Sequence, residues 1–261
     1  MKIVSSIFNG LKFITPALHI RDRFKITLSI SLIFITAVSC NNNDKTATKQ
    51  PGSVANKETK SSPAAKKTIV FFGNSITAGY GLEPEQAFPV LIQQKIDSLQ
   101  LNYKVVNAGV SGETSSGGNS RIDWILKQPV DVFVLELGAN DGLRGIPVAE
   151  TKRNLQVIID KVKTKYPDAQ LVLAGMQVPP NMGQKYATDF RSMFTELAKQ
   201  NNIALIPFLL EGVGGEATFN QQDGIHPNVE GAKIVAENVW AQLQRVLRGR
   251  LKRNFEDGFS Y

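Results

Sequence analysis

The sequence predicts an α/β fold: one three-layer α/β/α domain in which helices cover both faces of a central parallel sheet of about five strands. Two features of the chain point to this fold. Short runs of β-branched and aromatic residues alternate with longer segments in which apolar residues recur every three or four positions, as in strands that alternate with helices. Several of the short runs end in polar, glycine-containing turns, and in an open parallel sheet such turns gather at the edge where catalytic groups collect.

Each expected strand is a short apolar run bounded by turn-forming residues. The five runs are Thr68–Phe72, Tyr103–Asn107, Val130–Leu137, Leu171–Met176 and Ile203–Pro207. Two of the intervening segments show one apolar helical face each. The faces consist of Phe88, Leu91, Ile92, Ile96 and Leu99 in the first segment, and of Leu155, Ile158, Ile159 and Val162 in the second. A last helix is expected from about Val229 to Leu247, and residues 68–261 suffice for one domain with a sizeable core.

Residues 1–39 predict a signal peptide region. Basic residues precede an apolar run from Ile26 to Val38, which has the length of a signal-peptide core and is too short for a typical spanning helix. Small residues then precede Cys40. This pattern resembles a bacterial lipoprotein cleavage site, after which Cys40 would carry the lipid; an ordinary secretory signal is the alternative. We expect an exported protein, periplasmic or anchored as a lipoprotein in a bacterial envelope, whose start lies further along than Met1.

Residues 40–67 are expected to form a disordered tether between this anchor and the domain at residues 68–261. Lys, Thr, Ser and Asn dominate the segment without an apolar period, so it cannot bury a core. The chain has a formal net charge of +7, and residues 1–39 and 41–67 hold +4 each. The remaining charge of −1 removes the main support for nucleic-acid binding. Because the sequence offers no cluster of His and Cys ligands, we expect neither a metal nor a cofactor.

Asp223 and His226 are the first candidates for catalytic chemistry. His226 is one of two histidines, and the other, His19, lies in the expected signal region. A serine hydrolase needs a base that accepts the hydroxyl proton and a carboxylate that fixes the tautomer of that base. The turn Asp223-Gly-Ile-His226 supplies both groups, so the nucleophile must come from elsewhere in the chain.

Ser75 is the leading candidate for that nucleophile. It follows the expected strand Thr68–Phe72 and would lie at the carboxyl edge of the sheet. The alternative is that Ser75 caps the helix that follows, a common role of Ser after a Gly-Asn turn. Thr77 stands two residues after it, so the segment lacks the Gly-x-Ser-x-Gly elbow of the larger α/β-hydrolase fold.

Gly112 and Asn140 are candidates for stabilising negative charge. Attack on an ester carbonyl builds charge on oxygen, which backbone N–H groups and an asparagine amide can stabilise. Gly112 follows the second expected strand and Asn140 follows the third. Turn geometry alone could also have selected either residue. The repetition of polar turns at successive strand ends favours a functional role.

Four blocks together resemble the SGNH (GDSL) hydrolase superfamily. They are, in order, Gly73–Thr77 (GNSIT), Ser111–Glu113 (SGE), Gly138–Asp141 (GAND) and Asp223–His226 (DGIH). Three further segments are most similar to its bacterial periplasmic arylesterases and acyl thioesterase/lysophospholipases. These are Ala78–Gly81, Val106–Gly109 and Glu136–Gly145. The resemblance spans roughly Lys67 to Leu247 and implies a flavodoxin-like arrangement of the sheet.

The resemblance also implies what each of these residues does. Ser75 would be the nucleophile, His226 the base and Asp223 its partner. The oxyanion hole would consist of the backbone N–H groups of Ser75 and Gly112 together with the side chain of Asn140. All three members of the triad are present.

Several neighbouring polar residues need a separate interpretation. Asn74 stands where the family usually has Asp; it keeps the size and hydrogen-bonding reach of Asp without the charge, so activity is expected to survive. Glu136 lies inside an otherwise apolar strand and is expected to be paired with Arg121 or with a backbone amide. Glu113 and Asp141 are not needed by the mechanism and are expected to order their turns.

The substrate-binding residues are expected near the segment Gln177–Tyr186, which resembles the family's mobile substrate loop. Its prolines and glycine are equally consistent with an ordinary loop. An apolar wall for an acyl chain would be formed by Leu143, Met176, Val178 and Met182. These four residues could instead belong to the core.

The sequence therefore predicts a monomeric serine esterase that acts on a small acyl ester, a thioester or a lipid, attached to a membrane through its lipid anchor. One alternative is a carbohydrate O-deacetylase of the same superfamily, which the scarcity of aromatic residues near the four blocks disfavours. The other is a non-catalytic lipoprotein that binds an envelope ligand. The presence of Ser75, Asp223 and His226 argues against that second alternative.

Overall fold

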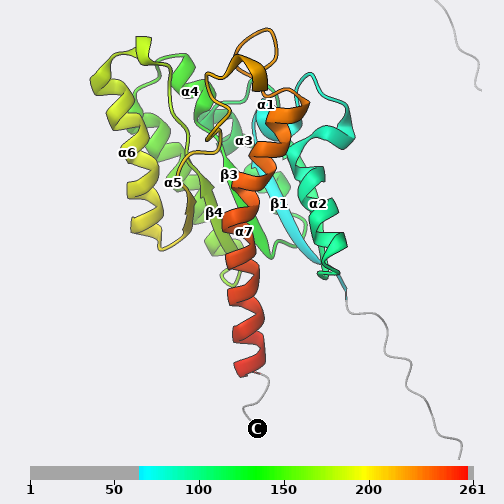
Figure 1. Ribbon diagram of the computed structural model, residues 1–261. Coiled ribbons are helices and arrows are strands. Elements are labelled where there is room, and N and C mark those ends of the chain that lie inside the picture. The colour runs from blue at the N-terminus through cyan, green and yellow to red at the C-terminus, as the bar shows by residue number, and fades with distance from the viewer. Residues whose placement is uncertain (1–64, 258–261) are drawn as a thin grey trace, which may run out of the picture. The chain divides into compact units, whose positions relative to one another are not determined.

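Five parallel strands form one sheet in the order β2-β1-β3-β4-β5 (Figure 1). The strands are β1 (Lys67–Gly73), β2 (Tyr103–Gly109), β3 (Val132–Glu136), β4 (Gln170–Ala174) and β5 (Ala204–Ile206). The computed structural model describes residues 65–257. The expected signal region at 1–39, Cys40 and nearly all of the tether at 40–67 lie outside the described residues, so those expectations stay predictions.

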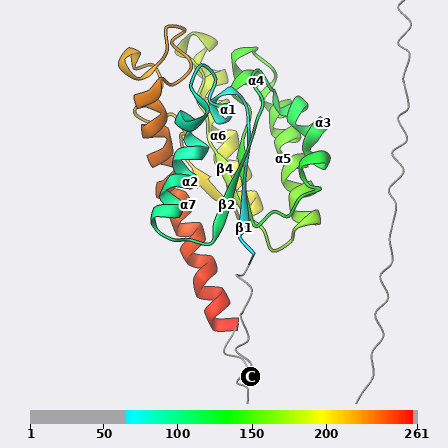
Figure 2. The ribbon, with the colours of Figure 1, turned by 90° about the vertical axis from the view of Figure 1, so that its right-hand side faces the viewer.

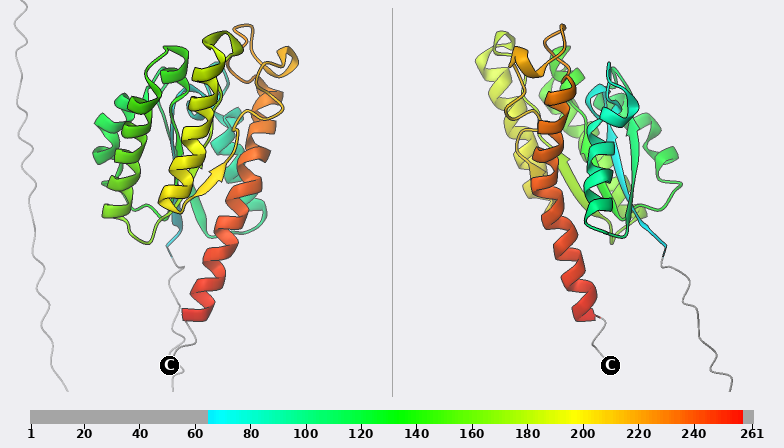
Figure 3. Two further views of the ribbon diagram at one scale, coloured as in Figure 1. Left: turned by 90° about the vertical axis from the view of Figure 1, so that its left-hand side faces the viewer. Right: turned by 45° about the vertical axis from the view of Figure 1, so that its right-hand side comes forward.

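Helices cover both faces of this sheet. The helices are α1 (Ser75–Ala78), α2 (Phe88–Ser98), α3 (Ser115–Ile125), α4 (Ala139–Leu143), α5 (Val148–Lys165), α6 (Gln184–Asn201) and α7 (Val229–Asp257), with short 3-10 turns η1 (Pro84–Gln86), η2 (Pro180–Met182) and η3 (Ala217–Phe219). Helices α2 and α7 pack together on one face, and α3 and α5 on the other (Figure 2). Helix α6 packs beside α5 (Figure 3). The predicted three-layer α/β/α fold with a five-stranded parallel sheet is confirmed.

The hydrophobic core lies on both sides of the central strands. Residues 69–72 of β1 are fully buried, because a strand between two parallel neighbours has helices above and below it. Such a strand reads as a continuous apolar run instead of an alternating one. Phe71 meets Phe88 of α2 edge to face, with ring centroids 5.4 Å apart, and Phe72 packs against Phe133 of β3.

The strand order reverses beside β1. The chain passes from β1 to β2 on one side of β1 and then returns to β3 on its other side. Right-handed crossovers in opposite directions place α2 and α3 on opposite faces of the sheet. In open α/β sheets, ligands bind at the carboxyl ends of the strands at this reversal. The loops after β1, β2 and β3 are therefore the ones that the fold brings to a site.

The ends of several elements differ from the sequence-based expectation. Strand β4 stops at Ala174 and not at Met176, because Gly175 turns against the chain after β5: a Cβ at Gly175 would overlap the carbonyl oxygen of Pro207. Helix α7 continues past Leu247 to Asp257, because the Arg, Lys and Glu residues there favour a helix after the apolar period ends. Over residues 65–257, no helix combines the length and apolar character needed to cross a membrane.

Candidate active site

Ser75 is the first residue of α1 and directly follows the end of β1. Asn74, and not Ser75, caps this short helix, because its Oδ1 accepts a hydrogen bond from the Ile76 N–H at 2.9 Å. Gly79 ends the helix with a φ of 78°, a conformation in which glycine carries no Cβ penalty. The capping role that the sequence left open for Ser75 therefore belongs to its neighbour.

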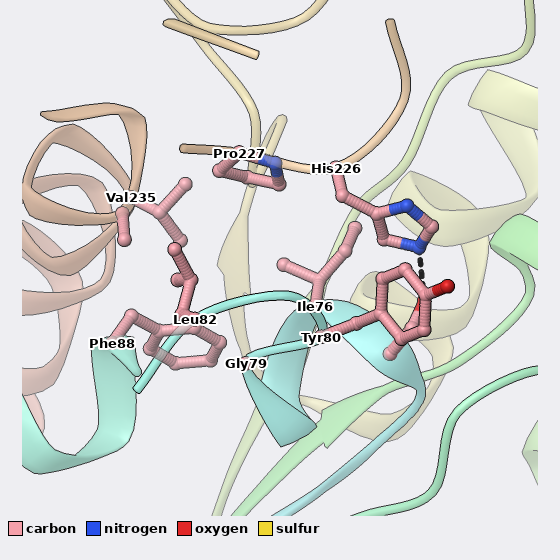
Figure 4. A pocket seen from close by; sticks show the side chains of 10 residues that line it. Ile76, Gly79, Tyr80, Leu82, Phe88, His226, Pro227 and Val235 are labelled. Carbon is pink, nitrogen blue, oxygen red and sulfur yellow. Dashed lines mark hydrogen bonds between the residues drawn. The ribbon is translucent and has the colours of Figure 1, made fainter. Parts of the chain in front are cut away.

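Ser75, His226 and Asp223 lie within hydrogen-bond distance of one another in series. His226 Nε2 is 2.9 Å from Ser75 Oγ, and His226 Nδ1 is 2.7 Å from Asp223 Oδ2. Figure 4 shows the imidazole above α1, with the hydrogen bond to Ser75 as a dashed line. This geometry suits a proton transfer from the hydroxyl to the imidazole while the carboxylate orients the ring.

The turn that carries Asp223 and His226 is held by the aspartate itself. Asp223 Oδ1 accepts hydrogen bonds from the N–H groups of Ile225 at 2.9 Å and His226 at 3.0 Å. Gly224 between them has a φ of 68°. The hydrogen bond from the His226 N–H, followed by that from the His226 ring, lowers the pKa of Asp223 to about 2. The carboxylate is therefore ionised at neutral pH and oriented by its own backbone.

Two residues that sequence reasoning missed hold this turn against the nucleophile segment. The Gln221 N–H donates to the His226 carbonyl at 2.8 Å, and Gln221 Nε2 donates to the Tyr80 carbonyl at 2.7 Å. The ring of Tyr80 lies 4.6 Å from that of His226 (Figure 4). Tyr80 is 52% exposed. An aromatic residue five positions after the candidate serine was the available signal for this contact.

The expected oxyanion-hole residues come from the ends of neighbouring strands. Gly112 has a φ of 77° in open space, so backbone conformation and not crowding requires glycine there. Asn140, in α4 after β3, donates from Nδ2 to the Glu113 carbonyl at 3.0 Å and so contacts the turn that contains Gly112. Within residues 65–257, the N–H groups of Ser75 and Gly112 donate to no other protein group. Asn140 is thus held to the turn that contains Gly112, and the role of all three donors stays a prediction.

Glu136 is hydrogen-bonded to the turn at residues 73–77 that carries Ser75, here called the nucleophile turn. Its Oε2 accepts hydrogen bonds from the Asn74 N–H at 3.0 Å and from Thr77 Oγ1 at 2.7 Å, and its Oε1 accepts from Asn74 Nδ2 at 2.6 Å. The expected pairing with a backbone amide is confirmed, whereas a pairing with Arg121 is wrong. Burial raises the pKa of Glu136 to about 7, although these hydrogen bonds oppose the shift.

The other two acidic residues order their turns, as expected. Glu113 forms a bidentate ion pair with Arg121 of α3. Asp141 accepts hydrogen bonds from the N–H of Ser115 at 2.8 Å and from its hydroxyl at 2.5 Å, which fixes the start of α3. In the described part of the chain, no three His, Cys, Asp or Glu side chains are placed to hold a metal ion.

Three of the four residues expected to line an acyl site lie around α4. Leu143 is 42% exposed. The segment after β4 packs against α4, because a Cβ at Gly142 would overlap Val178 and one at Gly145 would lie 3.7 Å from Met182 Cε. Met176 differs from the expectation: it is 3% exposed and belongs to the core, because the chain still runs inside the domain directly after β4.

A small crevice lies beside Ser75 and His226 on the side of α2 and α7 (Figure 4). Its lining is mainly apolar and includes Ile76, Leu82 and Val235. Its volume of about 10 Å³ corresponds to about one water molecule. The crevice is therefore too small for an acyl chain.

Comparison with known proteins identifies the family. Residues 71–234 match the model of the GDSL-like lipase/acylhydrolase family. The chain is 40% identical over 185 residues to esterase TesA of Pseudomonas aeruginosa, covering 70% of this chain and 91% of TesA. It is 37% identical over 182 residues to thioesterase 1/protease 1/lysophospholipase L1 of Escherichia coli K12, covering 69% of this chain and 85% of that relative. The crystal structure of TesA has a TM-score of 0.66 at 39% identity and covers 69% of this chain and 99% of its own. The chain therefore belongs to the GDSL-like lipase/acylhydrolase family and is a hydrolase that acts on ester bonds.

Proposed function

We propose that the chain is a serine esterase that cleaves carboxylic esters or thioesters through an acyl-enzyme intermediate. The observation that carries the proposal is the series of hydrogen bonds from Asp223 through His226 to Ser75. Ser75 Oγ attacks the acyl carbonyl carbon while His226 Nε2 accepts the hydroxyl proton. The ionised Asp223 stabilises the resulting imidazolium at Nδ1 and holds the tautomer that presents a free Nε2.

The tetrahedral intermediate places its negative charge on the former carbonyl oxygen. The N–H groups of Ser75 and Gly112 and the amide of Asn140 would donate to it. When the intermediate collapses, the bond to the leaving alcohol or thiol breaks, and His226 gives that group the proton. A water molecule then attacks the acyl-enzyme with His226 again as base, which releases the acid and restores Ser75.

The acyl group is assigned to the surface formed by Leu143, Val178 and Met182. The crevice on the other side of Ser75 is too small for it, and these side chains are apolar and at least partly exposed. The names of the relatives, an esterase and a thioesterase/lysophospholipase, support esters, thioesters and lysophospholipids as the substrate class.

Replacing the nucleophile tests the reaction. We expect Ser75→Ala to abolish hydrolysis of short p-nitrophenyl esters and labelling by a fluorophosphonate probe, with the unfolding temperature retained. Ser98→Ala is the matched control, because Ser98 lies on α2 and its hydroxyl bonds only to the Lys95 carbonyl among the described residues. Turnover by Ser75→Ala at the wild-type rate would exclude Ser75 as nucleophile. A folded wild-type protein that neither turns over nor is labelled would support the binding-module alternative.

A series of acyl chain lengths tests the substrate side. We expect Leu143→Ala to lower kcat/KM for long-chain esters, thioesters and lysophospholipids on the order of tenfold, and that for acetyl esters much less. Leu99→Ala is the matched control, since Leu99 is also an exposed leucine (56%) but follows α2. An equal effect of Leu143→Ala at every chain length would place the acyl chain elsewhere.

A further inference from the structure

The side chain of Arg121 connects three segments of the active-site edge. It comes from α3, and its Nε and Nη2 donate to the two carboxylate oxygens of Glu113 at 2.6 and 2.5 Å. Nη2 also donates to the Ala108 carbonyl at 2.8 Å and to the Gly73 carbonyl at 3.3 Å. One guanidinium therefore bonds to the end of β1, the end of β2 and the turn after β2.

The guanidinium is held in place by an aromatic ring as well. Its carbon lies 4.0 Å from the centroid of the Phe72 ring, within the range of a cation–π contact. The Arg121 side chain is 21% exposed and that of Glu113 is 7% exposed. Bidentate, charge-assisted hydrogen bonds with little solvent screening are among the stronger polar contacts in proteins. Lysine cannot reproduce them, because an ammonium lacks both the planar fork and the stacking face.

The bonded atoms lie next to the expected oxyanion donors. Gly73, the last residue of β1, precedes Ser75 by two residues, and Glu113 directly follows Gly112. Glu113 is bonded twice over, since its carboxylate accepts from Arg121 while its carbonyl accepts from the Asn140 amide. The Gly73 carbonyl also accepts from the Val110 N–H at 2.9 Å. A shift of Glu113 would therefore move Gly112 and Asn140 relative to Ser75.

We propose that Arg121 is a positioning residue that sets the oxyanion hole by fixing the turn of Gly112 and Glu113 against the end of β1. This role rests on the proposed function, because it assumes that Gly112 and Asn140 stabilise the oxyanion. Arg121 touches no reacting atom. Its contribution is to keep the donors in the geometry of the transition state, where a displacement of about 1 Å costs on the order of 100-fold in rate.

The test replaces each partner of the ion pair conservatively. We expect Arg121→Lys to lower kcat for a p-nitrophenyl ester by about 10- to 100-fold, with KM changed by no more than about twofold, as for an interaction that acts in the transition state. Glu113→Gln keeps the volume of the side chain and is expected to give a smaller loss of the same kind. It also tests the proposal independently if Arg121→Lys does not fold.

Two control variants separate positioning from general stability. Asp123 lies on α3, the helix that also carries Arg121. Asp123→Asn removes an exposed ion pair between this residue and Lys161 of α5. Ile158→Val loosens the core of α5 against α3, where Ile158 Cδ1 would lie 3.5 Å from a Cβ at Gly118. Both controls should retain wild-type kcat well below their unfolding temperatures, including Ile158→Val, which unfolds at a lower temperature than the wild type.

A double-mutant cycle provides a measurement that a purely structural role would not change. If Arg121 acts through the oxyanion hole, Arg121→Lys should reduce kcat by a smaller factor in an Asn140→Ala background than in the wild type. Equal factors in the two backgrounds, or wild-type kcat in both Arg121→Lys and Glu113→Gln, would overturn the proposal. Failure of the proposed function is distinguishable, because the wild type itself would then lack turnover and fluorophosphonate labelling.

Discussion

At the scale of single residues, the nucleophile turn rests on a buried carboxylate whose partners are all donors. Glu136 accepts from the backbone and side chain of Asn74 and from Thr77. Gly73 makes room for this cluster, because a Cβ there would overlap Thr77 Oγ1. Asn74 meets two needs: its Nδ2 donates to Glu136, and its Oδ1 accepts from the Ile76 N–H. The neutral amide of Asn74 thus donates to the Glu136 carboxylate and accepts from the Ile76 N–H.

Glu136 should make the stability of the fold depend on pH. Its pKa is 4.5 in the unfolded reference and about 7 in the fold, so the folded state binds the proton more tightly. This contribution to stability is fully present below about pH 4.5 and is lost as the pH rises through about 7, a loss on the order of 3 kcal/mol. We expect Glu136→Gln to flatten the curve of unfolding free energy between roughly pH 5 and pH 8, measured by urea denaturation. Parallel curves for the variant and the wild type would contradict this, and Glu150→Gln, at an exposed site, is the control.

Restoring the usual family residue should add a second titrating group. In Asn74→Asp, a carboxylate oxygen would replace the Nδ2 that lies 2.6 Å from Glu136 Oε1. Two carboxyl groups at that distance cannot both ionise readily, so the pair keeps one proton at neutral pH. The cap on Ile76 survives, and we expect activity at pH 7 to be retained. Stability should fall more steeply than in the wild type as the pH rises above neutrality, and unfolding free energies at about pH 7 and pH 9 would measure it. An unchanged pH dependence would show that the two side chains separate.

The residue scale also shows what one sequence can and cannot reveal. Ser75, His226 and Asp223 could be predicted because each lies in a short motif with a direct chemical reading. The partner of Glu136 could not, because it depends on strand register: β3 pairs with β1 so that Glu136 lies opposite Gly73, next to Asn74. A buried glutamate can be expected to have hydrogen-bond donors around it, but the register between strands determines which residues supply those donors. The same reasoning failed for Arg121, whose partner depends on the rotation of α3.

At the scale of elements, a short turn converts sequence proximity into catalytic geometry. The turn Asp223–His226 is stabilised through Asp223 Oδ1, while Oδ2 remains available for the imidazole. Stabilising the turn and orienting the imidazole therefore use different oxygen atoms of one carboxylate. The start of α7 packs on the segments that flank this turn, because a Cβ at Gly231 would overlap the Phe219 carbonyl and would lie 3.1 Å from Pro227 Cβ.

Asp223→Asn should separate the stabilisation of the turn from the orientation of the imidazole. The amide oxygen can still accept from the N–H groups of Ile225 and His226, so the turn and the unfolding temperature should persist. The amide NH₂ facing His226 Nδ1 would favour the wrong tautomer, and we expect kcat to fall on the order of 10⁴-fold, as in other serine hydrolase triads. Because the pKa of Asp223 is about 2, its carboxylate stays ionised at the neutral pH of the assay. Asp189→Asn, at an exposed site on α6, is the control, and a loss below tenfold would assign Asp223 a structural role only.

Strands and helices were predicted more reliably than their ends. The apolar run of β1 and the amphipathic pattern of α5 each specify an element by themselves, because burial dictates their periods. The end of β4 was misjudged because Met176 is as apolar as the strand before it, although the chain has already turned at Gly175. The end of α7 was misjudged for the opposite reason. Its last residues are helical but mainly polar, so the apolar repeat does not show where the helix ends.

At the scale of the whole molecule, the site and the point of chain entry lie at opposite ends of the sheet. Ser75, Gly112 and Asn140 follow the carboxyl ends of their strands. Lys67 begins β1 at the other end of the same sheet, where α7 also points away from the site edge (Figure 1). The chain thus enters β1 at Lys67, at the end of the sheet away from the site residues. Anchoring and catalysis should then be independent.

This independence leads to a prediction for Cys40, which lies outside the described residues. If Cys40 carries the lipid, Cys40→Ser should move the full-length protein, expressed in a bacterial host, from the detergent phase to the aqueous phase in detergent phase separation, because two or more acyl chains dominate membrane affinity. The variant should keep the wild-type kcat and KM on a soluble p-nitrophenyl ester, since its site edge is unaffected. Incorporation of labelled fatty acid into the wild type and not into Cys40→Ser would identify the modified residue. A variant that still enters the detergent phase would assign the membrane attachment to another part of the chain, and an aqueous wild type would favour the ordinary secretory signal.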